Sequence, residues 1–267
     1  GEVSGANFLE EYIFTYAKYR LAYKRPYETI NSDRLYNNLL SSQPMAFNLF
    51  CPLKRMLNER PSTATLALRA ALPDHRIAEV TDVELEYIPA NYMELSGDKS
   101  AMDAIIRFED EQGKGGFIAV ETKYSENLGT NVAYDRDENG KKIPRAKSIE
   151  AVTKLQCFTP DVEKSIIEGK TPLTQIYRNF LLSEMYGFEE GLLSYSIILA
   201  PRRHPSTKRE LESLTNGLRE EYKNKIEKID LEDFVERIIS VCPVEYATIF
   251  ERFYDRYLNF DKLKNKA

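Results

Sequence analysis

Hydrophobic and polar positions alternate along the middle of the chain. Residues 77–88 alternate apolar and acidic side chains, which predicts a half-exposed strand. Residues 101–109 and 116–124 are apolar runs joined by a glycine-rich turn, which predicts a hairpin. The continuous apolar run 192–199 is followed by Pro201 and predicts a buried fourth strand. We expect the first three strands to form an antiparallel meander, with the fourth inserted beside the third.

The segments around these strands repeat their apolar positions every three or four residues, as helices do. Before the strands, this spacing covers residues 7–23 and a segment that begins at Ser41 or Ser42. Between the third and fourth strands, a helix opens at 171–175 and is expected to end at Gly187. Later helices are expected at 207–228, 232–241 and 245–260. This order predicts an α/β protein with a central four-stranded mixed sheet.

Length and composition fit a soluble globular protein. The 267 residues suit one large domain, with 42% hydrophobic and 30% charged side chains. No apolar run approaches the ~20 residues needed to cross a bilayer, and the N-terminus lacks a secretory pattern. The three cysteines lie far apart, without redox or metal-ligand spacing. We therefore expect a cytoplasmic protein without a membrane partner.

Several kinds of catalytic chemistry are excluded or unsupported by residue types. Only two histidines are present, His75 and His204, which excludes a zinc site of several histidines. Neither a nucleophile elbow nor a glycine-rich phosphate loop occurs. The net charge of −5 gives no overall attraction to nucleic acid. Carboxylates and lysines remain as the candidates for chemistry.

Charged residues interrupt two of the apolar strands. Asp103 lies in the second strand, and Glu121 and Lys123 lie two apart in the third. Side chains two apart on a strand share a face, and unpaired charge on an apolar face is costly. A divalent cation would explain the cluster, because Mg²⁺ prefers oxygen ligands. Asp103, Glu121 and the Thr122 carbonyl are the expected ligands, with Mn²⁺ as a substitute, and Lys123 would orient or activate a water.

An acid on the second strand and Glu-x-Lys on the third resemble the PD-(D/E)xK nuclease superfamily. A bacterial group of nuclease-like proteins in it is similar also in a Ser-Gln-x-Met-x-Phe-Asn segment, here Ser42–Asn48. The resemblance covers residues 41–201 and implies a restriction-endonuclease-like αβββαβ core. Residues 1–40 and 202–267 would be helical additions to one domain spanning 1–267. Met102 stands where the superfamily's name has proline.

The resemblance also implies an activity. It implies metal-dependent hydrolysis of DNA phosphodiester bonds, with Asp103, Glu121 and Lys123 as catalytic residues. RNA remains open as a substrate, and a homodimer is possible where both strands of a duplex are cut. Gln175 is a candidate site-lining residue. A further acid often assists, and the candidates here are Glu59, Glu84 and Glu86.

Two other classes of function remain open on the sequence alone. The chain could be a non-catalytic nucleic-acid- or protein-binding module that keeps a nuclease-like fold. It could also be a helical assembly protein whose strand charges form surface ion pairs of about 0.2–1 kcal/mol. Metal binding at the acid pair distinguishes the first alternative. Placement of Asp103 and Glu121 on opposite faces would favour the second.

Overall fold

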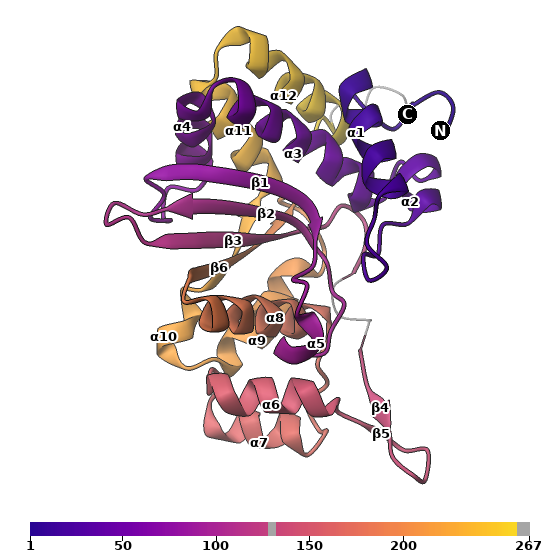
Figure 1. Cartoon of the computed structure of the whole chain (residues 1–267), viewed down its shortest axis with the longest axis vertical. Helices are drawn as coiled ribbons and strands as arrows, with labels where there is room; N and C mark the ends of the chain where they lie inside the picture. Colours follow the sequence, from indigo (N-terminus) through magenta and orange to yellow (C-terminus); the bar gives the residue numbers. More distant parts are fainter. Residues whose placement is uncertain (128–131, 261–267) are drawn as a thin grey trace.

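The structure is a computed structural model that describes residues 1–127 and 132–260. A mixed five-stranded sheet with the order β1-β2-β3-β6-β7 lies between two sets of helices (Figure 1). The strands of this sheet are β1 (Glu79–Tyr87), β2 (Met102–Glu109), β3 (Gly115–Thr122), β6 (Leu193–Ala200) and β7 (Ile226–Asp230). A separate two-stranded ribbon consists of β4 (Asp135–Arg136) and β5 (Lys142–Ile143).

The pairing confirms the predicted meander and the position of the strand after it. β1 pairs with β2, and β2 with β3, both antiparallel. β6 lies beside β3 and runs parallel to it. The sheet has five strands rather than the predicted four, because β7 adds parallel to β6. The mixed α/β class and its restriction-endonuclease-like order are as expected.

The extra strand corrects the helix predicted over residues 207–228. That segment contains α9 (Thr207–Gly217) and the short α10 (Glu220–Lys223), and it ends inside β7. Ile226 and Ile229 are three residues apart among charged neighbours, which is also a helical spacing. In the structure this segment completes the sheet beyond β6 instead.

Helices cover both faces of the sheet (Figure 1). One face carries the N-terminal and C-terminal helices, and the other carries helices from the middle of the chain. The first set is α1 (Glu11–Ala22), α2 (Ser32–Asn37), α3 (Ser42–Glu59), α4 (Pro61–Ala71), α11 (Leu231–Val241) and α12 (Val244–Tyr257). The second set is α5 (Tyr92–Leu95), α6 (Ala146–Leu155), α7 (Pro160–Ile167), α8 (Gln175–Glu190) and α9. No helix in the described parts of the chain is long and apolar enough to cross a membrane.

The sheet separates two hydrophobic cores, and β3 contributes alternate residues to each. Ile118 and Val120 pack in the core shared with α3 and α11. Phe117 and Ala119 pack in the core shared with α8. Because side chains alternate along a strand, this pattern continues to Glu121 on the α8 face. The polar residues at the end of β3 therefore meet the start of α8.

Helix α8 passes through the glycine that was predicted to end it. The helix extends to Glu190 and is terminated by Gly191, which has a φ of 66°. A Cβ atom at Gly187 would lie 2.7 Å from Cβ of Ser194 in β6. Gly187 therefore allows α8 to pack closely against the beginning of β6.

Candidate active site

Three carboxylates lie next to one another across three neighbouring strands. In the antiparallel register, Ala104 faces Val120 on one side and Leu85 on the other. The next position in this register places Asp103 beside Glu86 of β1 on one side and beside Glu121 of β3 on the other. All three, together with Lys123, line a cleft of about 860 Å³ that is open to solvent. The structure thus brings Asp103, Glu121 and Lys123 to one cleft at an end of the sheet, which Gln43 of α3 and Gln175 of α8 also line.

Glu121 is held by side chains on both sides. Lys123 Nζ lies 2.5 Å from Glu121 Oε1, and Gln175 Nε2 donates to the same oxygen at 2.9 Å. Asn179 Nδ2 donates to Glu121 Oε2 at 2.7 Å. Lys123 Nζ also donates to Gln175 Oε1 at 3.3 Å. The first two turns of α8 therefore fix the orientation of both charged side chains.

Asp103 is held by a single neighbour in β3. The backbone N–H and the hydroxyl of Thr122 both donate to Asp103 Oδ2, at 2.6 and 2.7 Å. Asp103 Oδ1 accepts no hydrogen bond from the described residues. Thr122 thus holds the acid with its N–H and side chain, and its carbonyl as a metal ligand stays a prediction.

Glu59, Glu84 and Glu86 are the three candidates for a further acid, and of these Glu86 lines the cleft. Gln43 Nε2, near the start of α3, donates to Glu86 Oε1 at 2.9 Å. Glu86 has a φ of 50°, and backbone strain of this kind in a residue other than glycine gathers at functional sites. Glu84 instead meets Arg20 at 3.8 Å, and Glu59 accepts a hydrogen bond from Tyr246 outside the cleft.

Burial makes the negative charge of this cluster costly. Burial raises the pKa of Glu121 to about 7, against the opposing charge of Lys123. Burial and the neighbouring Asp103 raise the pKa of Glu86 to about 8. The pKa of Asp103 is also raised by burial, although Lys123 and the Thr122 hydrogen bonds oppose this. Such a group of desolvated acids is stabilised by a nearby cation.

Lys123 is almost fully buried but remains charged. Burial alone would lower its pKa, yet the Glu121 and Asp103 carboxylates outweigh burial and raise it. Lys123 in turn opposes the rise in the pKa values of Glu121 and Asp103. Lys123 follows the last residue of β3, and its N–H still donates to the Leu199 carbonyl at 2.8 Å. This backbone bond holds the lysine in the plane of the sheet.

The chemistry of the donor set suits a hard divalent cation. The acids offer carboxylate oxygens, which Mg²⁺ prefers, and they lie in a water-accessible cleft. Within residues 1–127 and 132–260, no group of three or more acids, histidines or cysteines is arranged closely enough to hold a metal. Both oxygens of Glu121 accept hydrogen bonds from nitrogen donors. A cation at Glu121 would therefore compete with hydrogen bonds from Lys123, Gln175 and Asn179.

Two amides in this network were not anticipated from the sequence. Gln175, a predicted site-lining residue, borders the cleft that contains Asp103 and Glu121, and its role there stays a prediction. The sequence indicates no role for Asn179 or Gln43. Asn179 follows Gln175 by four residues, so the two share a helix face. Gln43 belongs to the Ser42–Asn48 segment quoted above, at the start of α3. Spacing within the helix was a usable signal for Asn179.

Comparison with known proteins gave one match. A family model described as the PD-(D/E)XK nuclease superfamily matches residues 1–259. This match confirms the resemblance drawn from Asp103, Glu121 and Lys123, and it extends beyond residues 41–201 to the N- and C-terminal helices. No curated protein and no solved structure matched the chain.

Proposed function

The chain belongs to the PD-(D/E)XK nuclease superfamily, and from this premise we propose that it hydrolyses phosphodiester bonds of DNA with a divalent metal ion. The observation that supports this most directly is the arrangement of Glu86, Asp103 and Glu121 beside Lys123 in one open cleft. Ordinary surface ion pairs do not place three desolvated acids and a buried lysine in one cleft.

In this proposal, Asp103, Glu121 and the Thr122 carbonyl hold Mg²⁺, and Mn²⁺ can replace it. Glu86 is the further acid in the cleft, and it would join the oxygen ligands only if its side chain moved closer to Asp103 and Glu121. When bound, the ion supplies a water of lowered pKa and stabilises negative charge on the phosphate. The unbonded Oδ1 of Asp103 leaves a lone pair for this purpose.

The protein's own residues then have separate tasks. Lys123 stays protonated beside the acids, so it is suited to orient a water and to stabilise charge that grows on the phosphate. Gln175 and Asn179 keep Glu121 in place through its two oxygens. Thr122 does the same for Asp103.

The test compares the wild-type protein with Lys123→Ala and Asp103→Asn on plasmid and single-stranded DNA, with Mg²⁺ or Mn²⁺. We expect metal-dependent cleavage that each substitution reduces at least about 100-fold. Lys225→Ala is the control, because Lys225 is a partly buried lysine that lies 3.9 Å from Glu184 outside the cleft. Equal cleavage by Lys123→Ala would remove this lysine from the mechanism. Parallel reactions with RNA establish the choice of nucleic acid.

One observation favours a second candidate function. Glu121 has internal partners at both oxygens, as it would in a binding module that no longer uses a metal. Calorimetric titration with Mn²⁺ distinguishes the two functions. Heat of binding that Asp103→Asn removes supports the nuclease. Nucleic-acid binding without any uptake of metal supports the non-catalytic module.

A further inference from the structure

A single arginine from outside the Asp and Glu-x-Lys motif reaches the same cleft. Arg34 belongs to α2 and lines the cleft together with Glu86 and Asp103. Burial raises the pKa of both acids, and the positive charge of Arg34 opposes that rise. Its charge therefore acts on the atoms where we place the reaction. No role in the site was assigned to this residue by the sequence.

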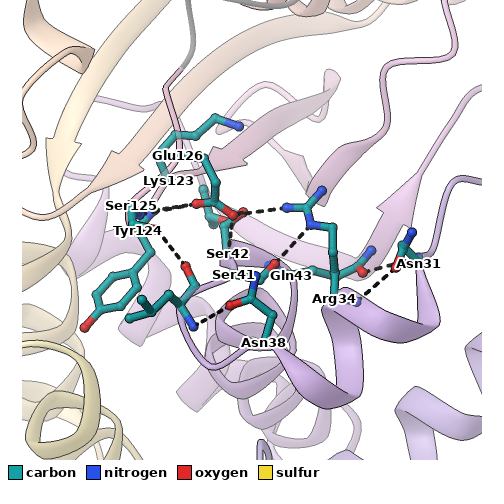
Figure 2. Close-up of polar contacts among 12 residues, drawn as sticks. Asn31, Arg34, Asn38, Ser41, Ser42, Gln43, Lys123, Tyr124, Ser125 and Glu126 are labelled. Atoms are coloured by element: carbon teal, nitrogen blue, oxygen red, sulfur yellow. Dashed lines mark hydrogen bonds and ion pairs between the residues drawn. The ribbon is translucent and has the colours of Figure 1, made fainter.

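The guanidinium of Arg34 is held at two points. Its Nε donates to Ser41 Oγ at 3.1 Å, and its Nη2 donates to Glu126 Oε1 at 3.1 Å. Figure 2 shows Glu126 between this guanidinium and the backbone after β3, where Lys123 lies. The side chain of Arg34 remains 48% exposed, and its Nη1 donates to none of the described residues. Arg34 is thus fixed in position and still has donors for a ligand.

Glu126 does not depend on Arg34 to satisfy its charge. Its Oε1 accepts from the N–H of Ser42 at 2.8 Å and from the Ser42 hydroxyl at 3.1 Å. Its Oε2 accepts from the N–H groups of Tyr124 and Ser125, both at 3.3 Å. Burial would raise the pKa of Glu126, but these hydrogen bonds, led by that of Ser42, outweigh it and lower the pKa.

The same contacts connect the Arg34 guanidinium to the segment that follows β3. Glu126 joins the N-terminus of α3 to the chain just after Lys123, 84 residues further along the sequence. A negative charge is favourable at a helix N-terminus, so this junction is stable without a ligand. Glu126, together with the Ser41 hydroxyl, therefore holds Arg34 in position, and Glu126 also connects it to the chain after Lys123 (Figure 2).

We propose that Arg34 binds a non-bridging oxygen of a substrate phosphate in the cleft, and that Glu126 is the positioning residue that aims it. This inference rests on the proposed nuclease function. A guanidinium has several donors in a fixed plane, which match phosphate oxygens. Contact with a phosphate carries no information about the bases, so this contact accepts any sequence.

The experiment uses Arg34→Gln, Arg34→Lys and a matched control, Arg60→Gln. Arg60 lies at the opposite end of α3, is 56% exposed, and pairs with Glu245 at 3.3 Å. It therefore resembles Arg34 in exposure and pairing but lies outside the cleft. Each protein is assayed for kcat and KM on DNA with Mg²⁺, and for DNA binding without divalent metal over a range of salt concentrations.

We expect Arg34→Gln to lower kcat/KM by about 10- to 100-fold, mainly through KM. The plot of the logarithm of the DNA association constant against the logarithm of salt concentration has a negative slope. For duplex DNA, its magnitude should decrease by about 0.9, the value for one lost phosphate contact. Arg34→Lys should restore most of that slope, because it keeps the charge, but only part of kcat/KM. Arg60→Gln should match the wild type in both.

Glu126→Gln tests the positioning role. It keeps an oxygen that can accept from Ser42 but loses the charge that holds Arg34. We expect a smaller loss of kcat/KM than for Arg34→Gln, with the salt slope unchanged because Arg34 is still present. The double variant Arg34→Gln and Glu126→Gln should be no worse than Arg34→Gln alone. Additive losses would show that Glu126 acts independently of Arg34 and would overturn the positioning role.

Failure of this inference is distinct from failure of the proposed function. A wild-type protein that cleaves DNA, with Arg34→Gln equal to it in KM and salt slope, overturns the role of Arg34 and leaves the nuclease intact. A wild-type protein that neither cleaves nor binds DNA or RNA overturns both. Melting temperatures of all variants identify any loss that comes from unfolding.

Discussion

Two buried glutamates lie along helix α8, one at its start and one in its second half. Glu121 meets Gln175 and Asn179 at the start of the helix, and Glu184 belongs to the second half of the helix itself. Burial raises the pKa of each to about 7. Their surroundings differ: Glu184 faces Lys225 at 3.9 Å, and its Oε1 has no hydrogen-bond partner among the described residues. Glu121 has three donors and two neighbouring acids.

The comparison shows that a raised pKa reports burial and does not by itself indicate chemistry. Glu184 borders only a separate hollow of about 420 Å³, where it is the one buried acid among the lining residues. Glu121 shares an open cleft of about 860 Å³ with Asp103 and Glu86. Acids from different strands that meet at one cleft are the stronger sign of a functional site.

The largest expected effect separates the two glutamates by activity. Glu121→Gln removes a proposed metal ligand, so we expect it to reduce DNA cleavage at least about 100-fold. Glu184→Gln removes the same charge from an equally buried position and should retain wild-type cleavage. The measurement is the initial rate of plasmid nicking in Mg²⁺. Similar losses in both variants would show that burial, and not position, explains the effect.

The next effect should be the same for both glutamates, because it depends on burial. The pKa of each glutamate is about 7 in the folded protein and about 4.3 in the unfolded chain. Between these two pH values, the folded protein therefore keeps a proton that the unfolded chain loses. Wild-type stability from this source is present below about pH 4 and is lost as the pH rises to about 7. Each Glu→Gln variant should therefore gain about 2 kcal/mol relative to wild type between pH 5 and pH 8.

This pH effect is measured by urea unfolding at pH 5 and pH 8 with a chelator present. Glu220→Gln is the control, because the side chain of Glu220 is 85% exposed. The burial effect would be contradicted if the difference in unfolding free energy between variant and wild type were the same at pH 5 and at pH 8. If only Glu121→Gln gained stability, the surroundings of the two glutamates would differ in more than their access to a cleft.

Metal binding should separate the two glutamates again, by a smaller amount. We expect saturating Mn²⁺ to stabilise the wild type by about 1–2 kcal/mol, and so to raise its melting temperature by a few degrees. Glu184→Gln should keep this shift, and Glu121→Gln should lose it. Calorimetric scans with and without Mn²⁺ supply the measurement. A shift that survives in Glu121→Gln would place the ion elsewhere.

The smallest effect concerns the amide that orients Glu121. Gln175→Ala removes a hydrogen bond to Glu121 and one from Lys123 but leaves both charges in place. We expect a loss of about tenfold in kcat, since such supporting contacts orient ligands without touching substrate. Glu190→Ala, at the exposed end of the same helix, should have no effect. A loss as large as that of Glu121→Gln would mean that Gln175 itself contacts the substrate.

The main part of the fold was predictable because its strands differ clearly from their surroundings. The runs in β2, β3 and β6 are apolar and bounded by glycine or proline, so their existence and order could be read from sequence. β7 could not, because only Ile226 and Ile229 are strongly apolar in it and their spacing also fits a helix. Its pairing is set by β6, which is a tertiary effect outside the local pattern.

The charged members of the site were predictable for a related reason. Asp103, Glu121 and Lys123 interrupt apolar strands, where charge requires an explanation. Asn179 and Gln43 are uncharged amides within helices and give no comparable signal. Glu86 could not be selected from Glu59 and Glu84, because the choice depends on the register of β1 against β2.

The parallel pairing of β3 with β6 has a consequence for the order in which the protein is made. Glu121 leaves the ribosome well before Gln175 and before the β6 residues that flank β3. A shorter nascent chain holds the acids but lacks the helix that orients them, and contacts so distant in sequence form late. Glu121 therefore gains its neighbouring parallel strand and the amide that orients it only after the chain is synthesised past residue 200.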